Sequence, residues 1–343
     1  MSRRILSFFR AYLYKKYLFN MVESSGDAQK KFSTLKLRVV SALVAAVCII
    51  GAYALFGKYG LIIAGSVAAL LSQREIARML LGIDKRYSNL FLFFSVSTYL
   101  MMVYLPNIAL HIFVFGLLLS LLSSFVILRT EVSIERIYLV LNRIVVCHLY
   151  TVLLPFFAVG LIHFERGDRW FALLIITVFA GDISAYFGGS QFGKNKLWPT
   201  VSPKKTWEGA VAGLVGSVIL GSLTYWYLLG KGSSYGISSH QGSLSDSSAP
   251  QSAAVETVRG LGTELDAVGA SMGGDHLSLL VVLLFLIAAS VSAQMGDFFE
   301  STIKRHVGVK DSGSLMPGHG GILDRIDGIL FGAPIIYFLA MLS

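Results

Sequence analysis

The sequence predicts an all-α fold: a polytopic integral membrane helical bundle of about nine transmembrane helices, with the N-terminus inside and the C-terminus outside. Three observations support this fold class. Hydrophobic residues make up 55% of the chain, charged residues make up 14%, and the mean hydropathy is +0.67, which excludes an ordinary soluble domain. The apolar residues are gathered in runs long enough to cross a bilayer, and the positive charges recur in alternate loops.

Each predicted span rests on a run of roughly 20 predominantly apolar residues. Most of the runs are apolar on every side, as expected of helices surrounded by lipid or by other helices. Lys and Arg are concentrated before the first span and after the second, fourth, sixth and eighth. Because cytoplasmic loops are enriched in Lys and Arg, this alternation sets the orientation. The spans are expected near 38–57, 59–81, 88–105, 107–128, 137–162, 169–188, 207–229, 277–296 and 322–342.

The chain divides into three predicted regions. Residues 1–36 are a basic cytoplasmic segment with interleaved apolar residues, which favours an interfacial helix on anionic lipid; a frayed cationic tail is the alternative. Residues 37–164 carry the N-terminal transmembrane helices, and residues 165–343 form the transmembrane region in which we expect catalysis. Within it, loop 230–276 is rich in Ser, Gly and Ala, so we expect a flexible, non-cytoplasmic linker.

The net charge and the cysteines exclude two other classes of function. A net charge of +9 could indicate nucleic-acid binding, but in a membrane protein it reflects cationic cytoplasmic loops, so we expect no nucleic acid partner. Cys48 and Cys147 both lie in apolar runs. They provide neither a disulfide framework nor a metal-binding spacing.

Segment 297–328 is the most informative part of the chain, because it is densely charged and lies between the last two apolar runs. Charge at a membrane border is costly and is usually kept for chemistry or transport. Carboxylates suit Mg²⁺, Lys and Arg suit phosphate, and glycines let the backbone approach a phosphate closely. We therefore interpret the segment as a site for an Mg²⁺–nucleotide next to a lipid phosphate. It contains Asp297, Glu300, Asp311, Asp324, Asp327, Lys304, Arg305, Lys310, Arg325, His306 and His319.

Helical spacing groups four oxygen-bearing side chains of this segment. Asp297 and Ser301 are four residues apart and share a face at the end of the eighth span. Asp324 and Asp327 are three apart and share a face at the start of the ninth. Two helix ends that meet in the bundle could bring these oxygens onto one or two cations. The alternative is that the carboxylates only pair with neighbouring Lys and Arg side chains.

A short glycine-containing turn precedes the ninth span. The backbone N–H groups that follow His319, Gly320 and Gly321 are expected to point out of the helix terminus, where they could cradle an anion. For His319 alone, a structural hydrogen bond and a substrate contact are equally open.

A second polar segment, 181–209, lies between the sixth and seventh spans. Asp182 and Tyr186 share a face near the inner end of the sixth span. Lys204 and Lys205 lie in a short polar turn, where they could hold a triphosphate or a lipid phosphate. A membrane anchor that obeys the positive-inside rule would explain the two lysines as well.

The start of the seventh span carries residues with an ordinary structural explanation. Ser202 or Thr206 could cap this helix, with Glu208 in its first turn. In the N-terminal half, Glu75 and Arg78 are interpreted as interfacial charges that form a local pair. Four isolated polar residues within spans are expected to make interhelical hydrogen bonds, namely His111, Asn142, Arg143 and His148.

The two polar segments resemble the phosphatidate cytidylyltransferase family, the CDP-diacylglycerol synthases. The resemblance is confined to these segments; elsewhere the chain matches only as a multi-span membrane protein. Met316 is a conservative departure, and loop 230–276 is longer than the family pattern. The matching positions are Ser301, Lys304, Arg305, Lys310, Asp311, Gly313, Pro317, His319, Gly320, Gly321, Asp324, Arg325 and Asp327, with Asp182, Ala185, Tyr186, Gly193, Lys194 and 202–209 upstream.

The resemblance implies transfer of CMP from CTP to phosphatidic acid, which gives CDP-diacylglycerol and pyrophosphate for phospholipid synthesis. It implies an Mg²⁺-assisted in-line attack at the α-phosphorus of CTP. The implied metal ligands are Asp297, Ser301 and Asp324. The implied catalytic residues are Asp297, Lys310, Asp311, His319, Asp324, Arg325 and Asp327. The implied substrate-binding residues are Asp182, Tyr186, Lys194, Ser202, Lys204, Lys205, Thr206, Glu208, Lys304, Arg305, Gly320 and Gly321.

The resemblance also implies the surroundings in which the protein works. The expected partners are CTP, phosphatidic acid and membrane lipid, and the expected location is the bacterial inner membrane with the active site on the cytoplasmic face. A second cation and a homodimer both stay open.

Two other classes of function remain alternatives. A membrane transferase that passes a phospho-sugar to polyprenyl phosphate would also need Asp, Mg²⁺ and a cytoplasmic face. A secondary transporter would use intramembrane carboxylates for ions, but its site should lie near the bilayer midplane between repeats. In this chain the charges gather at one membrane face, and no clear internal repeat is visible.

Overall fold

The computed structural model describes residues 40–41, 43–44, 46–82, 85–128, 133–230, 279–316 and 320–343. Three predictions fall on other residues: the interfacial helix in 1–36, the flexible linker that begins at residue 230, and the role of His319. These three stay predictions.

Helices account for almost all of the regular structure in the described residues. The N-terminal half of the chain supplies a series of helices that follow one another closely. They are α2 (Lys58–Leu81), α3 (Lys85–Tyr104), η1 (Pro106–Ile108), α4 (Ala109–Leu128), α5 (Ile134–His148), η2 (Leu149–Leu153), α6 (Leu154–Gly160) and η3 (Leu161–His163). The all-α class that the apolar runs predict is thereby confirmed.

The C-terminal half adds four long helices and a small β-hairpin. Strands β1 and β2 pair in antiparallel fashion, with Lys196 opposite Thr206 and Trp198 opposite Ser202. The elements are α7 (Gly167–Phe192), β1 (Lys196–Trp198), β2 (Ser202–Thr206), α8 (Trp207–Tyr225), η4 (Trp226–Gly230), α10 (Leu279–His306) and α11 (Leu323–Leu342). The sequence alone predicts only a polar turn where this hairpin forms.

Seven helices in the described part of the chain are long and apolar enough to cross a membrane. The two other predicted spans correspond to α3 and to a shorter apolar helix, Ala46–Phe56, so the count of nine stays a prediction. The seven helices are Lys58–Leu81, Pro106–Val126, Ile134–His163, Gly167–Phe192, Trp207–Gly230, Leu279–His306 and Leu323–Leu342.

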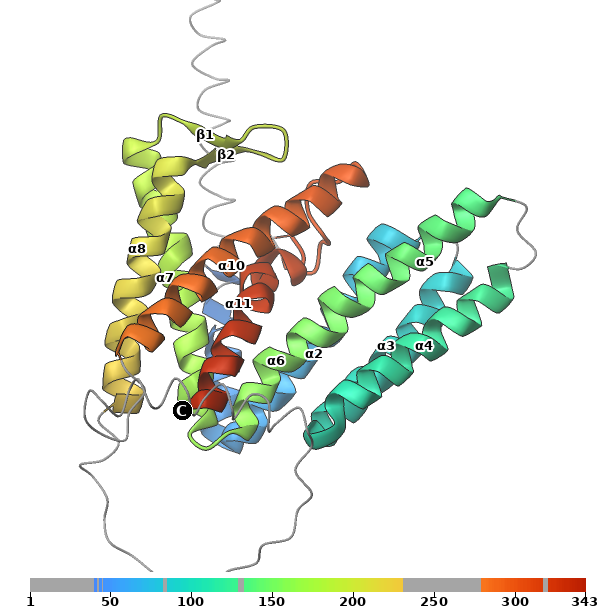
Figure 1. Ribbon diagram of the computed structural model, residues 1–343, viewed down its shortest axis with the longest axis horizontal. Coiled ribbons are helices and arrows are strands. Elements are labelled where there is room, and N and C mark those ends of the chain that lie inside the picture. The colour runs from blue at the N-terminus through green and yellow to red at the C-terminus, as the bar shows by residue number, and fades with distance from the viewer. Residues whose placement is uncertain are drawn as a thin grey trace, which may run out of the picture.

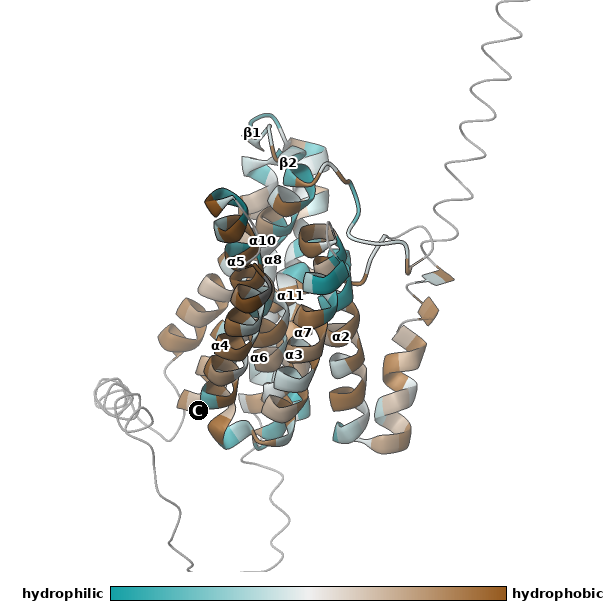
Figure 2. Ribbon diagram, turned by 90° about the vertical axis from the view of Figure 1, so that its right-hand side faces the viewer, coloured by the Kyte–Doolittle hydropathy of each residue, from teal (hydrophilic) through white to brown (hydrophobic). Residues whose placement is uncertain are grey.

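The outward faces of the bundle are apolar. Helix α4 exposes Phe115, Leu118 and Leu122, as expected for a helix that faces lipid rather than water. In Figure 2 brown predominates along α4, α5 and α6, whereas teal gathers at the end that carries β1 and β2. Hydrophobic flanks with a polar end are the distribution expected of a protein that lies in a bilayer.

Two clusters of buried side chains hold the C-terminal helices in place. One joins α6, α7, α10 and α11 around residues such as Trp170 and Leu286. The other contains Ile76 of α2 together with Ile303 of α10 and Leu323 of α11. The second cluster fixes the N-terminal half of the chain against the beginning of α11, where the predicted site begins.

The polar segments that the sequence singles out lie at one end of the bundle. Figure 1 shows the hairpin and the connection between α10 and α11 at one end, and the connection between α6 and α7 at the other. The two polar segments are therefore brought to the same end by the fold, although more than one helix separates them in sequence.

This arrangement makes the predicted orientation testable at two exposed positions. We expect a cysteine at Ser314 to be labelled only after the membrane is opened, because the α10–α11 connection is predicted to be cytoplasmic. A cysteine at Glu165, at the opposite end, should be labelled in intact cells. Cys48 is exposed, so both variants belong in a Cys48→Ser background. Labelling of Ser314→Cys in intact cells would show that the predicted orientation is wrong.

Candidate functional site

The site is built where α10 and α11 approach closely. Gly296 permits this approach, because a Cβ there would lie 2.5 Å from the carbonyl oxygen of Asp327. One turn away, the Ser292 hydroxyl donates to the Phe331 carbonyl at 2.7 Å. Because the helices touch at Gly296, the next residue, Asp297, is held within electrostatic reach of Asp327.

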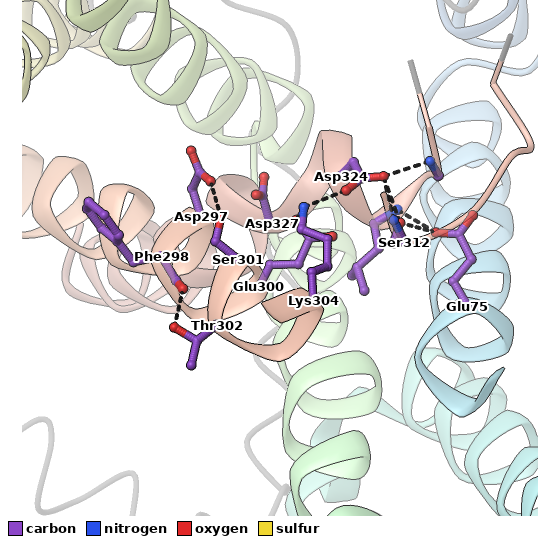
Figure 3. A network of polar contacts seen from close by, with 12 residues as sticks. Glu75, Asp297, Phe298, Glu300, Ser301, Thr302, Lys304, Ser312, Asp324 and Asp327 are labelled. Carbon is purple, nitrogen blue, oxygen red and sulfur yellow. Dashed lines mark hydrogen bonds and ion pairs between the residues drawn. The ribbon is translucent and has the colours of Figure 1, made fainter. Parts of the chain in front are cut away.

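Asp297 contacts a helical neighbour and a cation from the hairpin. Its Oδ1 accepts from the Ser301 hydroxyl at 3.4 Å, which confirms that the two side chains share a face (Figure 3). Its Oδ2 lies 2.5 Å from Lys205 Nζ, and this pair is partly open to solvent, with the side chains 39% and 30% exposed. Lys205 Nζ also lies 4.3 Å from the centre of the Phe298 ring.

The hairpin that carries Lys205 is fixed by further contacts to α10 and α8. Trp198 packs against Phe298 with ring centroids 5.9 Å apart, and Arg305 Nε donates to the Val201 carbonyl at 3.4 Å. At its base, the Thr206 hydroxyl accepts from Gly209 N and caps α8.

A second anchor of the hairpin is Glu208, whose Oε1 accepts from the Asn195 side chain at 2.9 Å and from its backbone N–H at 3.1 Å. Thr206 and Glu208 therefore have structural partners in the protein. The capping role that the sequence left open is confirmed for Thr206.

Asp324, in the first turn of α11, is the most heavily bonded carboxylate of the site. Its Oδ1 lies 2.6 Å from Lys304 Nζ. Its Oδ2 accepts from Ser312 N, the Ser312 hydroxyl and Gly321 N at 2.8–3.0 Å. Lys304 also lies 3.2 Å from Glu300, whose side chain is completely buried. Figure 3 shows this network running from α10 across the start of α11 to α2.

Two interpretations of the sequence are corrected at the start of α11. Of the backbone N–H groups expected to cradle a substrate anion, that of Gly321 is already bonded to Asp324, and those of the next two residues, Ile322 and Leu323, are bonded to Glu75. Glu75 is not paired with Arg78 at the interface, because it is buried and both its oxygens face α11. Its role was missed because its partners lie in a distant part of the chain.

Other predicted residues lie around this centre. Asp182 of α7 is within electrostatic reach of Asp297, Lys205 and Arg325, so α7 contributes to the same site. Tyr186, one turn further along α7, is 71% exposed. Several further predicted side chains at this end are exposed or partly exposed, namely Lys194, Ser202, Lys204, Lys310 and Asp311.

Polar residues elsewhere in the spans serve the packing. Arg143 Nη1 donates to the Leu80 carbonyl of α2 at 3.0 Å, the interhelical bond that the sequence predicts. His148 instead contacts the Ile144 carbonyl of its own helix at 3.1 Å and packs edge-on against Phe91.

The donor atoms at Asp297 fit a hard cation. Asp297 and Ser301 present neighbouring oxygen atoms at a partly exposed position, where Lys205 forms an ion pair with Asp297. Asp324 is more buried, and its two oxygens have four contacts with protein donors. Across the described residues, no three His, Cys, Asp or Glu side chains gather as a metal-binding group. A carboxylate beside a hydroxyl oxygen is the kind of donor set that could hold Mg²⁺, an ion usually bound by one or two carboxylates together with water and substrate phosphates.

Comparison with known proteins identifies similar sequences. A family model described as the cytidylyltransferase family matches residues 36–343. The chain is 34% identical over 178 residues to the phosphatidate cytidylyltransferase of Bacillus subtilis, covering 52% of this chain and 49% of that protein.

Two further relatives give the same result. The phosphatidate cytidylyltransferase of Helicobacter pylori is 35% identical over 188 residues, covering 54% of this chain and 53% of the relative. That of Thermotoga maritima is 34% identical over 169 residues, covering 49% and 48%. The chain spans about half the length of the curated relatives it matches.

Proposed function

Because the chain belongs to the cytidylyltransferase family, we propose that it transfers CMP from CTP to phosphatidic acid. The products are CDP-diacylglycerol, a precursor for phospholipid synthesis, and pyrophosphate. The relatives named phosphatidate cytidylyltransferase support this choice of substrates. Both predicted alternatives, a phospho-sugar transferase and a transporter, have less support, because the matching family is one of cytidylyltransferases.

One observation of the structure carries the proposal: two distant polar segments meet at one end of the helical bundle. Lys205 of β2 lies against Asp297 of α10, and Lys304 of α10 lies against Asp324 of α11. Carboxylates and lysines in alternation suit a substrate with several phosphate groups and a divalent counterion. Trp198 of β1 and Trp207 at the start of α8 are exposed at this end, where they could contact a lipid substrate.

The reaction proceeds by displacement at phosphorus. A phosphate oxygen of phosphatidic acid forms a bond to the α-phosphorus of CTP, while the bond from that phosphorus to the α,β-bridging oxygen breaks and pyrophosphate leaves. In such transfers the protein contributes mainly positioning and charge stabilisation. Lys204, Lys205, Arg305 and Arg325 would hold phosphate oxygens and offset the charge that develops on the leaving group.

Mg²⁺ would be held by Asp297 and Ser301, with Asp324 as the third proposed ligand. When bound, the ion supplies electrostatic stabilisation of the phosphate oxygens. For Asp297, binding requires the Lys205 ammonium to move away from the carboxylate, and the lysine is then available to a phosphate. For Asp324, it requires rearrangement of the Lys304 ion pair. A second cation beside Asp297 and Asp324 is part of the proposal.

The proposed setting rests on the alternation of positively charged loops in the sequence. The active site lies on the cytoplasmic face of the bacterial inner membrane, where CTP is present, and phosphatidic acid reaches it from the surrounding lipid. Of the other predicted side chains, Lys194, Lys310 and Asp311 are exposed at this end and would contact the substrates. The homodimer remains a proposal.

Turnover of labelled CTP by the purified protein tests this function. We expect CDP-diacylglycerol to form from CTP and phosphatidic acid in the presence of Mg²⁺, with loss of product when the ion is chelated. A parallel reaction with a UDP-sugar and polyprenyl phosphate should give no transfer. Product in the second reaction and none in the first would identify the protein as the other type of transferase.

A further inference from the structure

We propose that Glu75, in the N-terminal half of the chain, is a positioning residue for the catalytic segment. It fixes the start of α11 and, through Ser312, the carboxylate of Asp324. The inference rests on the proposed function in one respect only, namely that Asp324 takes part in catalysis. The positioning contacts themselves are independent of which substrates are used.

The contacts of Glu75 reach the start of α11 from a helix far away in the sequence. Oε1 accepts from Ile322 N at 3.0 Å, and Oε2 accepts from Leu323 N at 2.9 Å. These N–H groups belong to the first turn of α11, where backbone donors have no partner within the helix. A carboxylate at this end of a helix is also favoured by the helix dipole.

Ser312 connects Glu75 to Asp324. Its hydroxyl lies 3.0 Å from both Glu75 Oε2 and Asp324 Oδ2 and can donate its single proton to either of them, one at a time. Its backbone N–H donates to the same Asp324 oxygen at 2.9 Å. The other oxygen of Asp324 lies against Lys304. A continuous path of polar contacts therefore leads from α2 to the lysine of α10 (Figure 3).

Two glycines of the α10–α11 connection leave room for the Glu75 carboxylate. A Cβ at Gly313 would lie 2.6 Å from Glu75 Oε1. A Cβ at Gly321 would collide with both the Glu75 carboxylate and the Ser312 hydroxyl. The connection thus wraps around a side chain from another part of the protein. If Glu75 only formed a salt bridge with Arg78 at the membrane surface, the connection would not need glycines around its carboxylate.

The contacts at this position suit a carboxylate, and the corresponding amide would lose one of them. Both oxygens of Glu75 accept from a backbone N–H, so a glutamine would turn one N–H₂ group toward a backbone donor in either orientation of the amide. The side chain is only 5% exposed, so water cannot readily replace the lost acceptor. We expect Glu75→Gln to fold but to hold Asp324 less precisely.

The test compares Glu75→Gln and Ser312→Ala with the wild-type protein. Because displacement of a catalytic group by about 1 Å can cost 10²-fold in rate, we expect kcat to fall about 10²-fold in Glu75→Gln and about tenfold in Ser312→Ala. The KM for CTP should change little, and the Mg²⁺ concentration for half-maximal activity should rise in both. The double variant should be no worse than Glu75→Gln alone, because both changes act on one path.

Arg78→Gln is the matched control, because Arg78 is exposed on the same helix. It should keep the wild-type kcat and Mg²⁺ dependence. If Glu75 served only stability, the folded fraction of Glu75→Gln would turn over at the wild-type rate with an unchanged Mg²⁺ dependence, and the proposal would be overturned. If Glu75→Gln does not fold, Ser312→Ala becomes the decisive variant. A wild-type rate and Mg²⁺ dependence in Ser312→Ala would then overturn the positioning proposal.

A second readout separates this inference from the proposed function. Amide hydrogen exchange of segment 320–328 should be faster in Glu75→Gln than in the wild-type protein or Arg78→Gln, whatever the substrates are. Unchanged exchange would overturn the positioning role. If the wild-type protein fails to convert CTP, only the proposed function is refuted. The hydrogen-exchange result then decides whether Glu75 has the positioning role.

Discussion

Asp297→Asn and Asp324→Asn are each expected to lower kcat by at least about 10²-fold, the scale of losing one electrostatic contact in the transition state. Each change removes a negative charge that faces a lysine, Lys205 for Asp297 and Lys304 for Asp324. Steady-state turnover of CTP and phosphatidic acid over a range of Mg²⁺ concentrations measures the effect. The apparent affinity for Mg²⁺ should fall as well.

The folds of both variants are expected to survive. In Asp324→Asn the amide oxygen can still accept from Ser312 N and Gly321 N. The N–H₂ group then faces Lys304, donor against donor, but Lys304 keeps its ion pair with Glu300. Asp297 is partly exposed, so loss of its charge leaves no buried group without a partner. Thermal unfolding of the purified variants tests this point.

Glu165→Gln is a control for a lost carboxylate, because this exposed residue lies in the connection that leads into α7, at the opposite end of the bundle (Figure 1). It should retain the wild-type rate. Near-normal Mg²⁺-dependent turnover in both aspartate variants would show that the proposed cation site is wrong.

Lys204→Arg combined with Lys205→Arg is expected to leave membrane insertion intact but to remove most of the cytidylyltransferase activity. The structure places Lys205 against Asp297 and above Phe298, whereas Lys204 is exposed. A planar guanidinium cannot replace a compact ammonium in such a position without moving its neighbours. We therefore expect Lys205→Arg alone to lower kcat at least about tenfold, and Lys204→Arg to have the smaller effect.

Lys196→Arg provides the matched control for the double variant. Lys196 is an exposed residue on the opposite strand of the same hairpin, and the substitution keeps its charge. Its activity should equal that of the wild-type protein. Equal activity of the double variant and this control would mean that Lys204 and Lys205 only anchor the protein at the membrane surface.

The sequence predicts well those features that depend on neighbouring residues. The apolar runs identify the helices, and the spacing of Asp297 and Ser301 predicts their contact, because residues four apart on a helix face each other. The capping role of Thr206 follows from the same local rules. The hairpin was missed, since its strands are only three and five residues long and contain a polar Ser-Pro-Lys-Lys run.

The sequence by itself determined the class of fold, the predicted orientation and the two segments that carry the chemistry, because hydropathy, charge and helical periodicity are local properties. Only the tertiary structure decided which of these residues meet. Glu75 lies 247 residues from Ile322, and its burial depends on how α2 packs against the start of α11. Periodicity within one helix cannot specify such a contact, since the packing of many side chains on several helices fixes it.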